Sequence, residues 1–133
     1  MQVEPLESRT FLSADGNTVT VPLKDSASGN LFAGVGEGTA TQLGKFTATI
    51  DANLLVVFTA ANGDQLWVQG LSLVQESPTV LHIESQVVGG TGRFEGASSG
   101  ISGHDIHFVD DQGDFVFNAE TTITLQRPWN LQA

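Results

Sequence analysis

The segment Gly89–Gly100, with the sequence GGTGRFEGASSG, is the stretch that decides the fold. Four of its glycines, at positions 89, 90, 92 and 96, follow a valine-rich run that ends at Val88. Because glycine adopts positive φ without a Cβ clash, this composition predicts a sharp corner between two strands and not a helix. Alternation along an extended chain predicts two faces, with Phe94, Gly96 and Ser98 on one and Arg93, Glu95 and Ala97 on the other.

Alternating apolar and polar residues recur along the rest of the chain, and turn residues separate them. Asn62-Gly63 is the strongest of the turn signals and predicts a hairpin with a type I′ turn. Further turns or loops are predicted at Asp25-Ser26, at Ser28 to Asn30, at Asp51 to Asn53, at Gln75 to Pro78 and at Asp110 to Gly113. Strands are predicted at 17–23, 38–50, 54–61, 67–74, 79–88 and, besides the glycine corner, over a closing run from Phe115 to Leu125.

The composition fits a single all-β domain. The chain has 133 residues with 15 Gly and 8 Phe, and no long stretch of strong helix formers interrupts the strand pattern. Cysteine is absent, which excludes a disulfide framework and a Cys-based zinc site. The net charge of −10 opposes binding to nucleic acid, and no apolar run approaches the ~18 residues of a membrane span.

About eight short antiparallel strands without helical periodicity predict an all-β fold, an antiparallel β-barrel of calycin or lipocalin-like shape. A barrel of this size is either filled by side chains or holds one small ligand. An immunoglobulin-like sandwich is the alternative, although its Cys–Trp–Cys signature is missing.

The glycine corner also carries a family resemblance. The string GGTGRFEGA at residues 89–97 resembles the GG(S/T)GxFEGA corner of the allene oxide cyclases, and the related dirigent proteins share its first part. The segment Gly63–Gly70, GDQLWVQG, resembles the cyclase strand with VQG about twenty residues before the corner. The resemblance implies an allene-oxide-cyclase-like barrel that acts as a cyclase or isomerase by holding a folded conformer of a small hydrophobic substrate.

Two features depart from the family pattern. The cyclases carry a catalytic Glu on the N-terminal strand region, whereas the corresponding stretch 17–30 has Asp25 as its only acid, in a predicted loop. The aromatic residue that follows the FEGA motif in the cyclases is replaced by Ser98, where dirigent proteins usually carry Arg. The alternative function is therefore a non-catalytic carrier, or a structural or accessory barrel module.

The first fourteen residues are expected to be a flexible leader, which leaves residues 15–133 for the barrel. Val3–Ser13, VEPLESRTFLS, resembles the LEPRxLL-type motif near the start of exported bacterial proteins. The resemblance implies a secreted or cell-surface location.

An apolar and aromatic lumen is expected to bind the hydrophobic ligand, without a cofactor. Trp67 belongs to that lumen only if Gln69 also points inward. The residues expected to contact the ligand are Phe46, Phe58, Trp67, Gln69, Phe94, Ser98 and Phe117.

The histidines provide the other candidates. His104 shares a predicted face with Phe108 and is the one histidine expected near the lumen, where it is a candidate general acid or base. His82 and Glu84 share a face that is expected to point outward, a spacing that suits a metal with one further ligand. Without that ligand in the sequence pattern, no metal site is predicted. The mixed face of 80–88 and the family resemblance predict a homo-oligomer, either a dimer or a trimer.

Overall fold

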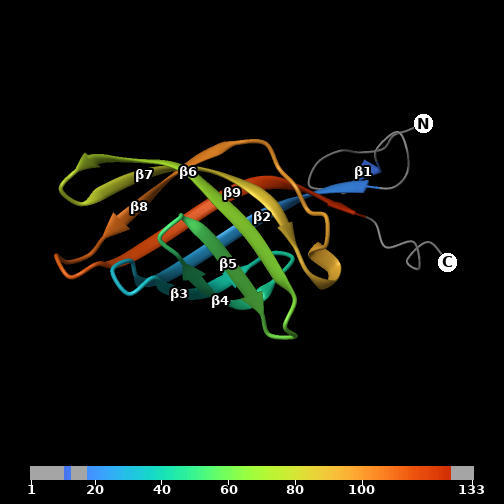
Figure 1. Cartoon of the computed structure of the whole chain (residues 1–133), viewed down its shortest axis with the longest axis horizontal. Helices are drawn as coiled ribbons and strands as arrows, with labels where there is room; N and C mark the ends of the chain where they lie inside the picture. Colours follow the sequence, from blue (N-terminus) through green and yellow to red (C-terminus); the bar gives the residue numbers. More distant parts are fainter. Residues whose placement is uncertain (1–10, 13–17, 127–133) are drawn as a thin grey trace.

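A computed structural model describes residues 11–12 and 18–126 of the chain, and nearly all of them lie in strands or tight turns (Figure 1). The elements in chain order are β1 (Phe11–Leu12), β2 (Thr18–Asn30), β3 (Val35–Ala40), β4 (Gly44–Ile50), β5 (Leu55–Ala60), β6 (Gln65–Ser77), β7 (Val80–Gly90), the 3₁₀ turn η1 (Gly92–Phe94), β8 (Ser102–Phe108) and β9 (Asp114–Gln126).

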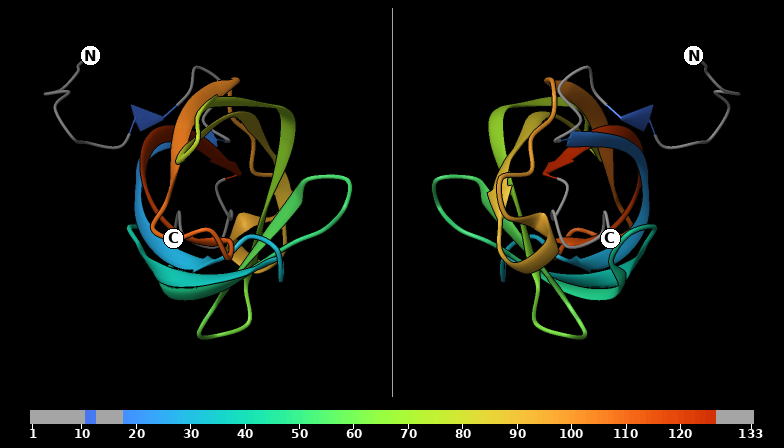
Figure 2. Two further views of the ribbon diagram at one scale, coloured as in Figure 1. Left: turned by 90° about the vertical axis from the view of Figure 1, so that its left-hand side faces the viewer. Right: turned by 90° about the vertical axis from the view of Figure 1, so that its right-hand side faces the viewer.

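The strands form one antiparallel sheet that closes into a barrel. Each strand pairs with the next in sequence, and β9 returns to pair with β2 from Thr18↔Gln126 to Asn30↔Asp114. The views along the barrel show this ring of strands (Figure 2). The prediction of an eight-stranded antiparallel barrel is therefore confirmed for β2–β9, and the sandwich alternative is wrong because one continuous sheet closes on itself.

One end of the barrel is filled by a packed core. Phe94 of η1 is completely buried, as are Leu66 at the start of β6 and Ile123 near the end of β9. η1 packs against β6, β7 and β9, so the glycine corner covers this end of the barrel. No described segment covers the other end in this way, and the lumen is accessible there. That end holds the turns β2–β3, β4–β5, β6–β7 and β8–β9.

The glycine corner is a turn and a coil, and not a regular strand. Gly92 has φ of 60° and Gly96 has φ of 76°, in the region that favours glycine. The 3₁₀ turn follows a period of three, so Phe94 and Ala97 are buried together while Ser98 is exposed. The expected alternation, with Phe94 and Ser98 on one face, is therefore wrong.

β2 is longer than the sequence pattern predicted. The predicted loops at Asp25-Ser26 and Ser28 to Asn30 are wrong, because this segment continues as strand and pairs with β3 and β9 on its two sides. Gly29 lies opposite Gly36 and Ala27 lies opposite Gly38, so small residues let the two strands approach closely.

The predicted strand 38–50 is in fact a hairpin of β3 and β4. Its turn depends on Gln42 with φ of 74° and Gly44 with φ of 71°. The Asn62-Gly63 hairpin between β5 and β6 is confirmed, but its turn differs from type I′. The positive φ, 95°, falls on Gly63 and not on Asn62, and the Gly63 N–H donates to the Ala60 carbonyl at 2.9 Å.

The predicted leader, residues 1–14, lies mostly outside the described residues. Its described part, Phe11–Leu12, forms β1 and pairs with Val19 and Thr20 of β2. Among the described residues, no helix combines the length and apolar character needed to cross a membrane.

Candidate functional site

The open end of the barrel contains an apolar cavity of about 100 Å³. Its lining comes from all eight barrel strands, β2–β9, and from two turns, and Ser85 is its single polar side chain. We call it the apolar cavity, and its lining residues are Ala27, Leu31, Gly36, Ala48, Ile50, Leu54, Val56, Phe58, Val68, Leu73, Ile83, Ser85, Ile106, Phe115 and Phe117.

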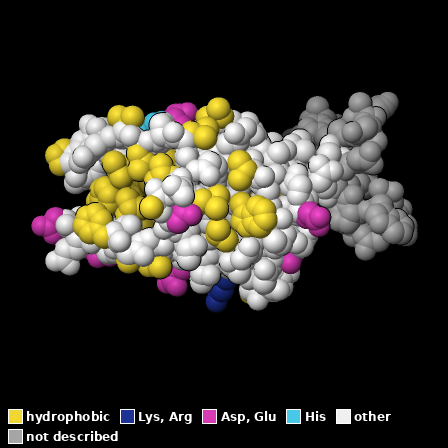
Figure 3. All heavy atoms as spheres, viewed as in Figure 1, with side chains coloured by type: hydrophobic (Ala, Val, Ile, Leu, Met, Phe, Trp, Pro, Cys, Tyr) yellow, Lys and Arg dark blue, Asp and Glu magenta, His cyan; other side chains and the backbone are white. Residues whose placement is uncertain are grey.

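Hydrophobic side chains surround the entrance of this cavity. Figure 3 shows them gathered around a hollow at the end of the barrel that holds the β6–β7 hairpin. Leu54, in the β4–β5 turn, lines the cavity with φ of 65°, which is unusual for a residue with a Cβ. The Leu54 carbonyl accepts a hydrogen bond from the Gly70 N–H at 2.8 Å, and a Cβ at Gly70 would lie 2.8 Å from the Leu54 Cβ. The turn is therefore held against β6 with its leucine at the entrance.

A second cavity of about 50 Å³ lies deeper in the lumen, toward the packed end. It shares Phe58, Val68, Ser85 and Phe117 with the apolar cavity, and it differs by its polar groups. We call it the Asp25 cavity, and its other lining residues are Leu23, Asp25, Gln86, Val87, Ser99, Ser102, His104, Ala119 and Thr121.

Asp25 is the acidic residue of the lumen wall. It lies between the buried Leu23 and the inward-facing Ala27 on β2, opposite Ala40 of β3 and Ala119 of β9. Burial raises the pKa of Asp25 from 3.8 to about 6, and a hydrogen bond with its own backbone opposes that rise. A carboxyl group with this pKa exchanges protons near neutral pH, which general acid–base chemistry requires.

His104 of β8 lines the same cavity, as expected from the sequence. Its Nε2 lies 3.1 Å from the Ser102 hydroxyl, and its ring makes an edge contact with Phe117 at a centroid distance of 5.9 Å. Burial lowers the pKa of His104. The deeper part of the lumen therefore combines a carboxyl group, an imidazole and the hydroxyl of Ser85 beneath an apolar entrance.

Of the residues expected to contact the ligand, Phe58 and Phe117 line both cavities. Phe46 also points inward, but it belongs to the packed core and meets Phe58 edge to face at a centroid distance of 4.9 Å. These three positions agree with the expected inward faces of β4, β5 and β9.

Trp67 and Gln69 do not face the lumen. Their neighbours Leu66 and Val68 occupy the inward positions of β6, so Trp67 and Gln69 lie on its outer face. The Trp67 indole N–H donates to Gln65 Oε1 at 3.0 Å, and the Gln69 amide donates to the Asn53 carbonyl at 2.8 Å. The two residues do share a face, but it is the outer one.

Phe94 and Ser98 also lie away from the two cavities. Phe94 is fully buried at the packed end, where Arg93 lies over its ring at 4.9 Å. Ser98 is exposed and forms a two-residue bridge with Thr124. Because the 3₁₀ turn breaks the alternation before Ser98, the corner closes the barrel and does not line its cavities.

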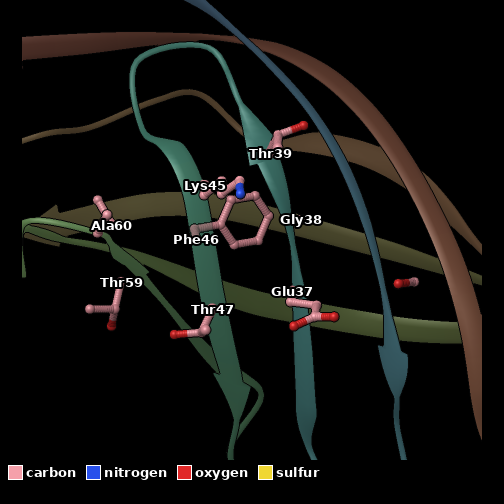
Figure 4. A pocket seen from close by; sticks show the side chains of 10 residues that line it. Glu37, Gly38, Thr39, Lys45, Phe46, Thr47, Thr59 and Ala60 are labelled. Atoms are coloured by element: carbon pink, nitrogen blue, oxygen red, sulfur yellow. The ribbon is translucent and has the colours of Figure 1, made fainter.

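A hollow of about 650 Å³, larger than either cavity of the lumen, lies on the outer face of β3, β4 and β5 (Figure 4). Its rim consists of polar outward-facing residues such as Glu37, Lys45 and Thr47, and it lacks the apolar enclosure of the lumen. We therefore take the lumen as the candidate site.

The sequence reasoning missed Asp25 as a site residue. The signal was present, because Val21, Leu23, Asp25 and Ala27 alternate without interruption. An acid followed by Ser favours a loop, whereas the alternation indicates an inward position of a strand, which the structure confirms.

The closed sheet and the two-part lumen define a small antiparallel β-barrel with an internal cavity. Comparison of the chain with protein-family models, with curated proteins and with solved structures gives no match.

Proposed function

We propose that this barrel binds a small hydrophobic molecule carrying one hydrogen-bonding group. The observation that carries the proposal is the lumen itself, an apolar cavity that adjoins a smaller one with Asp25 and His104 in its wall. An apolar concavity with a few convergent polar groups is the usual form of a small-molecule site. The apolar part binds the body of the ligand, and the polar part orients its functional group.

The size of the lumen limits the ligand. A dry apolar cavity of about 150 Å³ accommodates benzene. The cavity of about 100 Å³ therefore admits a ligand of a few carbon atoms, or the end of a longer chain whose remainder lies in the hydrophobic entrance.

Binding is tested by NMR titration with short ketones and alcohols such as 2-pentanone, whose few carbon atoms match the size of the cavity. Ala48→Phe places a ring in the apolar cavity, whereas Thr49→Phe adds the same ring at the adjacent exposed position. We expect saturable binding that weakens by about tenfold or more, or about 1.4 kcal/mol, in the Ala48 variant only. A wild-type barrel without saturable binding, or an equal loss in both folded variants, would refute the proposal and favour a structural module.

A second candidate function, isomerisation by proton transfer, is favoured by Asp25. In a β,γ-unsaturated ketone, the Asp25 carboxylate removes a proton from the α carbon, between the carbonyl group and the double bond. The resulting dienolate takes the same proton back at its γ carbon, which gives the conjugated ketone. Burial and the raised pKa of Asp25 make both directions of this transfer accessible near neutral pH. The resemblance to the allene oxide cyclases also supports an isomerase function. In such an enzyme the lumen holds the substrate in one conformer while the reaction occurs.

Cyclohex-3-enone, converted to its conjugated isomer, tests this chemistry by ultraviolet absorbance. Asp25→Asn should bind 2-pentanone as the wild type does and lose the isomerisation. Equal rates for both proteins would assign the lumen to a carrier.

We also propose export and self-association. The VEPLESRTFLS segment supports a secreted or cell-surface location. The outward face of β7, with the exposed Val88 among polar residues, supports a homo-oligomer. Detection of the full-length protein in the medium or on the surface of a producing bacterium tests the first, and a cytoplasmic location would contradict it.

A further inference from the structure

The outer face of β6, β7 and β8 holds a cluster of ionisable side chains that the lumen does not use. His82 is at its centre, with its Nδ1 2.9 Å from Asp105 Oδ1 and its Nε2 2.7 Å from Glu84 Oε2. Ligand atoms of Glu76, His82 and Asp105 all lie within 4.8 Å of one another. We propose that Glu76, His82 and Asp105 bind a divalent transition-metal ion of the Zn²⁺ type on this face.

The three side chains converge because of strand register. His82 of β7 lies directly opposite Asp105 of β8. Glu76 is the extra residue of a β-bulge near the end of β6, where the register with β7 shifts between Gln75 and Ser77. A bulge of this kind re-aims a side chain, and here it brings the Glu76 carboxylate to the imidazole. The sequence showed His82 and Glu84, and the bulge and the β7–β8 register supply the ligands that the sequence pattern lacked.

Gly103 makes room for the cluster. A Cβ at this position of β8 would lie 2.6 Å from Glu84 Oε2 and 2.8 Å from His82 Nε2. The imidazole and the Glu84 carboxylate therefore occupy space over β8 that another residue would fill. The His82 ring therefore lies against the backbone of Gly103, and its Nε2 contacts the Glu84 carboxylate.

Each ring nitrogen of His82 contacts a carboxylate, so the tautomer decides which nitrogen binds the metal. In the tautomer whose Nε2–H donates to Glu84, the Nδ1 lone pair faces Asp105. A carboxylate that accepts the second N–H of a metal-binding histidine is the usual outer partner in such sites. Ligand atoms around tetrahedral Zn²⁺ are about 3.4 Å apart. Side-chain rotations that move the three ligand atoms by less than about 1.5 Å would therefore bring them to this spacing. The exposed position leaves the fourth coordination site to water.

The charge and the donor atoms favour a transition metal over Mg²⁺. The imidazole nitrogen suits Zn²⁺, Co²⁺, Ni²⁺ and Cu²⁺, whereas Mg²⁺ prefers oxygen ligands and octahedral geometry. The net charge of −10 further favours a cation at any surface site, so selectivity between metals is the informative measurement.

Isothermal titration calorimetry of the intact chain with Zn²⁺ and with Mg²⁺ tests the site. We expect one Zn²⁺ per chain, loss of binding in His82→Gln and Asp105→Asn, and about 10–100-fold weaker binding in Glu84→Gln. His104→Gln removes a neighbouring histidine that lines a hollow with His82 and Asp105 but is not one of the three ligands, and Glu37→Gln removes a surface charge on β3. Both variants should bind Zn²⁺ as the wild type does. Gly103→Ala should weaken binding although it removes no ligand atom.

Imidazole nitrogen shifts in NMR spectra provide an independent measurement. Zn²⁺ should move the Nδ1 signal of His82 and leave His104 unchanged. The proposal is overturned by the absence of Zn²⁺ binding up to millimolar concentration, by equal binding of Mg²⁺, by affinity that is unchanged in both His82→Gln and Asp105→Asn, or by an equal loss in His104→Gln.

Discussion

The raised pKa of Asp25 links the lumen to stability in a way that one substitution measures. The folded protein holds the Asp25 proton with a pKa of about 6, against 3.8 for the exposed side chain. The folded state therefore binds this proton more tightly than the unfolded state does. The contribution of this proton to the free energy of unfolding is fully present below pH 3.8 and is lost as the pH rises through 6. Two pKa units at 1.36 kcal/mol each give a penalty of about 3 kcal/mol above pH 7.

Asp25→Asn removes this penalty and keeps a side chain of the same size. We expect the variant to be up to about 3 kcal/mol more stable than the wild type at pH 8, and to lose this advantage between pH 6 and pH 4. His104 is the other titratable group of the same cavity and is present in both proteins, so its contribution largely cancels in the difference.

Urea unfolding of both proteins at several values between pH 4 and pH 8 measures this difference, provided that the m-values agree. Asp111→Asn, at an exposed turn position, is the matched control for the loss of one charge. If the stabilities of the wild type and the Asp25 variant stay parallel across the whole pH range, the carboxyl group is hydrated and the reasoning about the lumen fails.

Three further predictions concern packing and assembly. Phe94→Ala should lower the free energy of unfolding by about 3–5 kcal/mol, because Phe94 fills the packed end. It should leave the affinity for 2-pentanone unchanged, because Phe94 lines neither cavity, and weakened binding in the folded variant would contradict this. Gly92→Val should cost about 1–3 kcal/mol or more in urea unfolding, because φ is 60° and the new side chain meets the Asp64 carboxylate; a neutral substitution would show that the corner relaxes. Light scattering at micromolar concentration with EDTA should show a dimer or trimer that Val88→Glu dissociates, and a wild-type monomer would remove the oligomer proposal.

The sequence predicted the barrel because its signal is repeated along the chain. Alternation placed Phe117 of β9 at the lumen and His82 and Glu84 of β7 on the outer face, and the structure confirms both. Those faces are set by burial of every second residue, which the order of apolar and polar residues shows directly.

The details that the sequence did not predict depend on backbone conformation or on neighbouring strands. Gln42 adopts positive φ in the β3–β4 turn, although glutamine is not a residue type that indicates such a conformation. The 3₁₀ turn changes the period from two to three and moves Ser98 out of the expected set. Trp67 is large and apolar, but one face of its strand was already filled by Leu66 and Val68. Each of these positions is decided by tertiary context and not by residue type.

The pairing of β2 with β9 also has a consequence for how the protein folds. The first long strand of the described chain pairs with β3 along part of one edge, but its other edge pairs with the last strand, β9, along 13 residues. During synthesis, β2 therefore exposes an unpaired edge until the C-terminal strand leaves the ribosome, and pairing over such a sequence separation is slow. The lumen does not exist before this step. A ligand that binds there adds to stability only after closure, so it slows unfolding and does not guide the nascent chain.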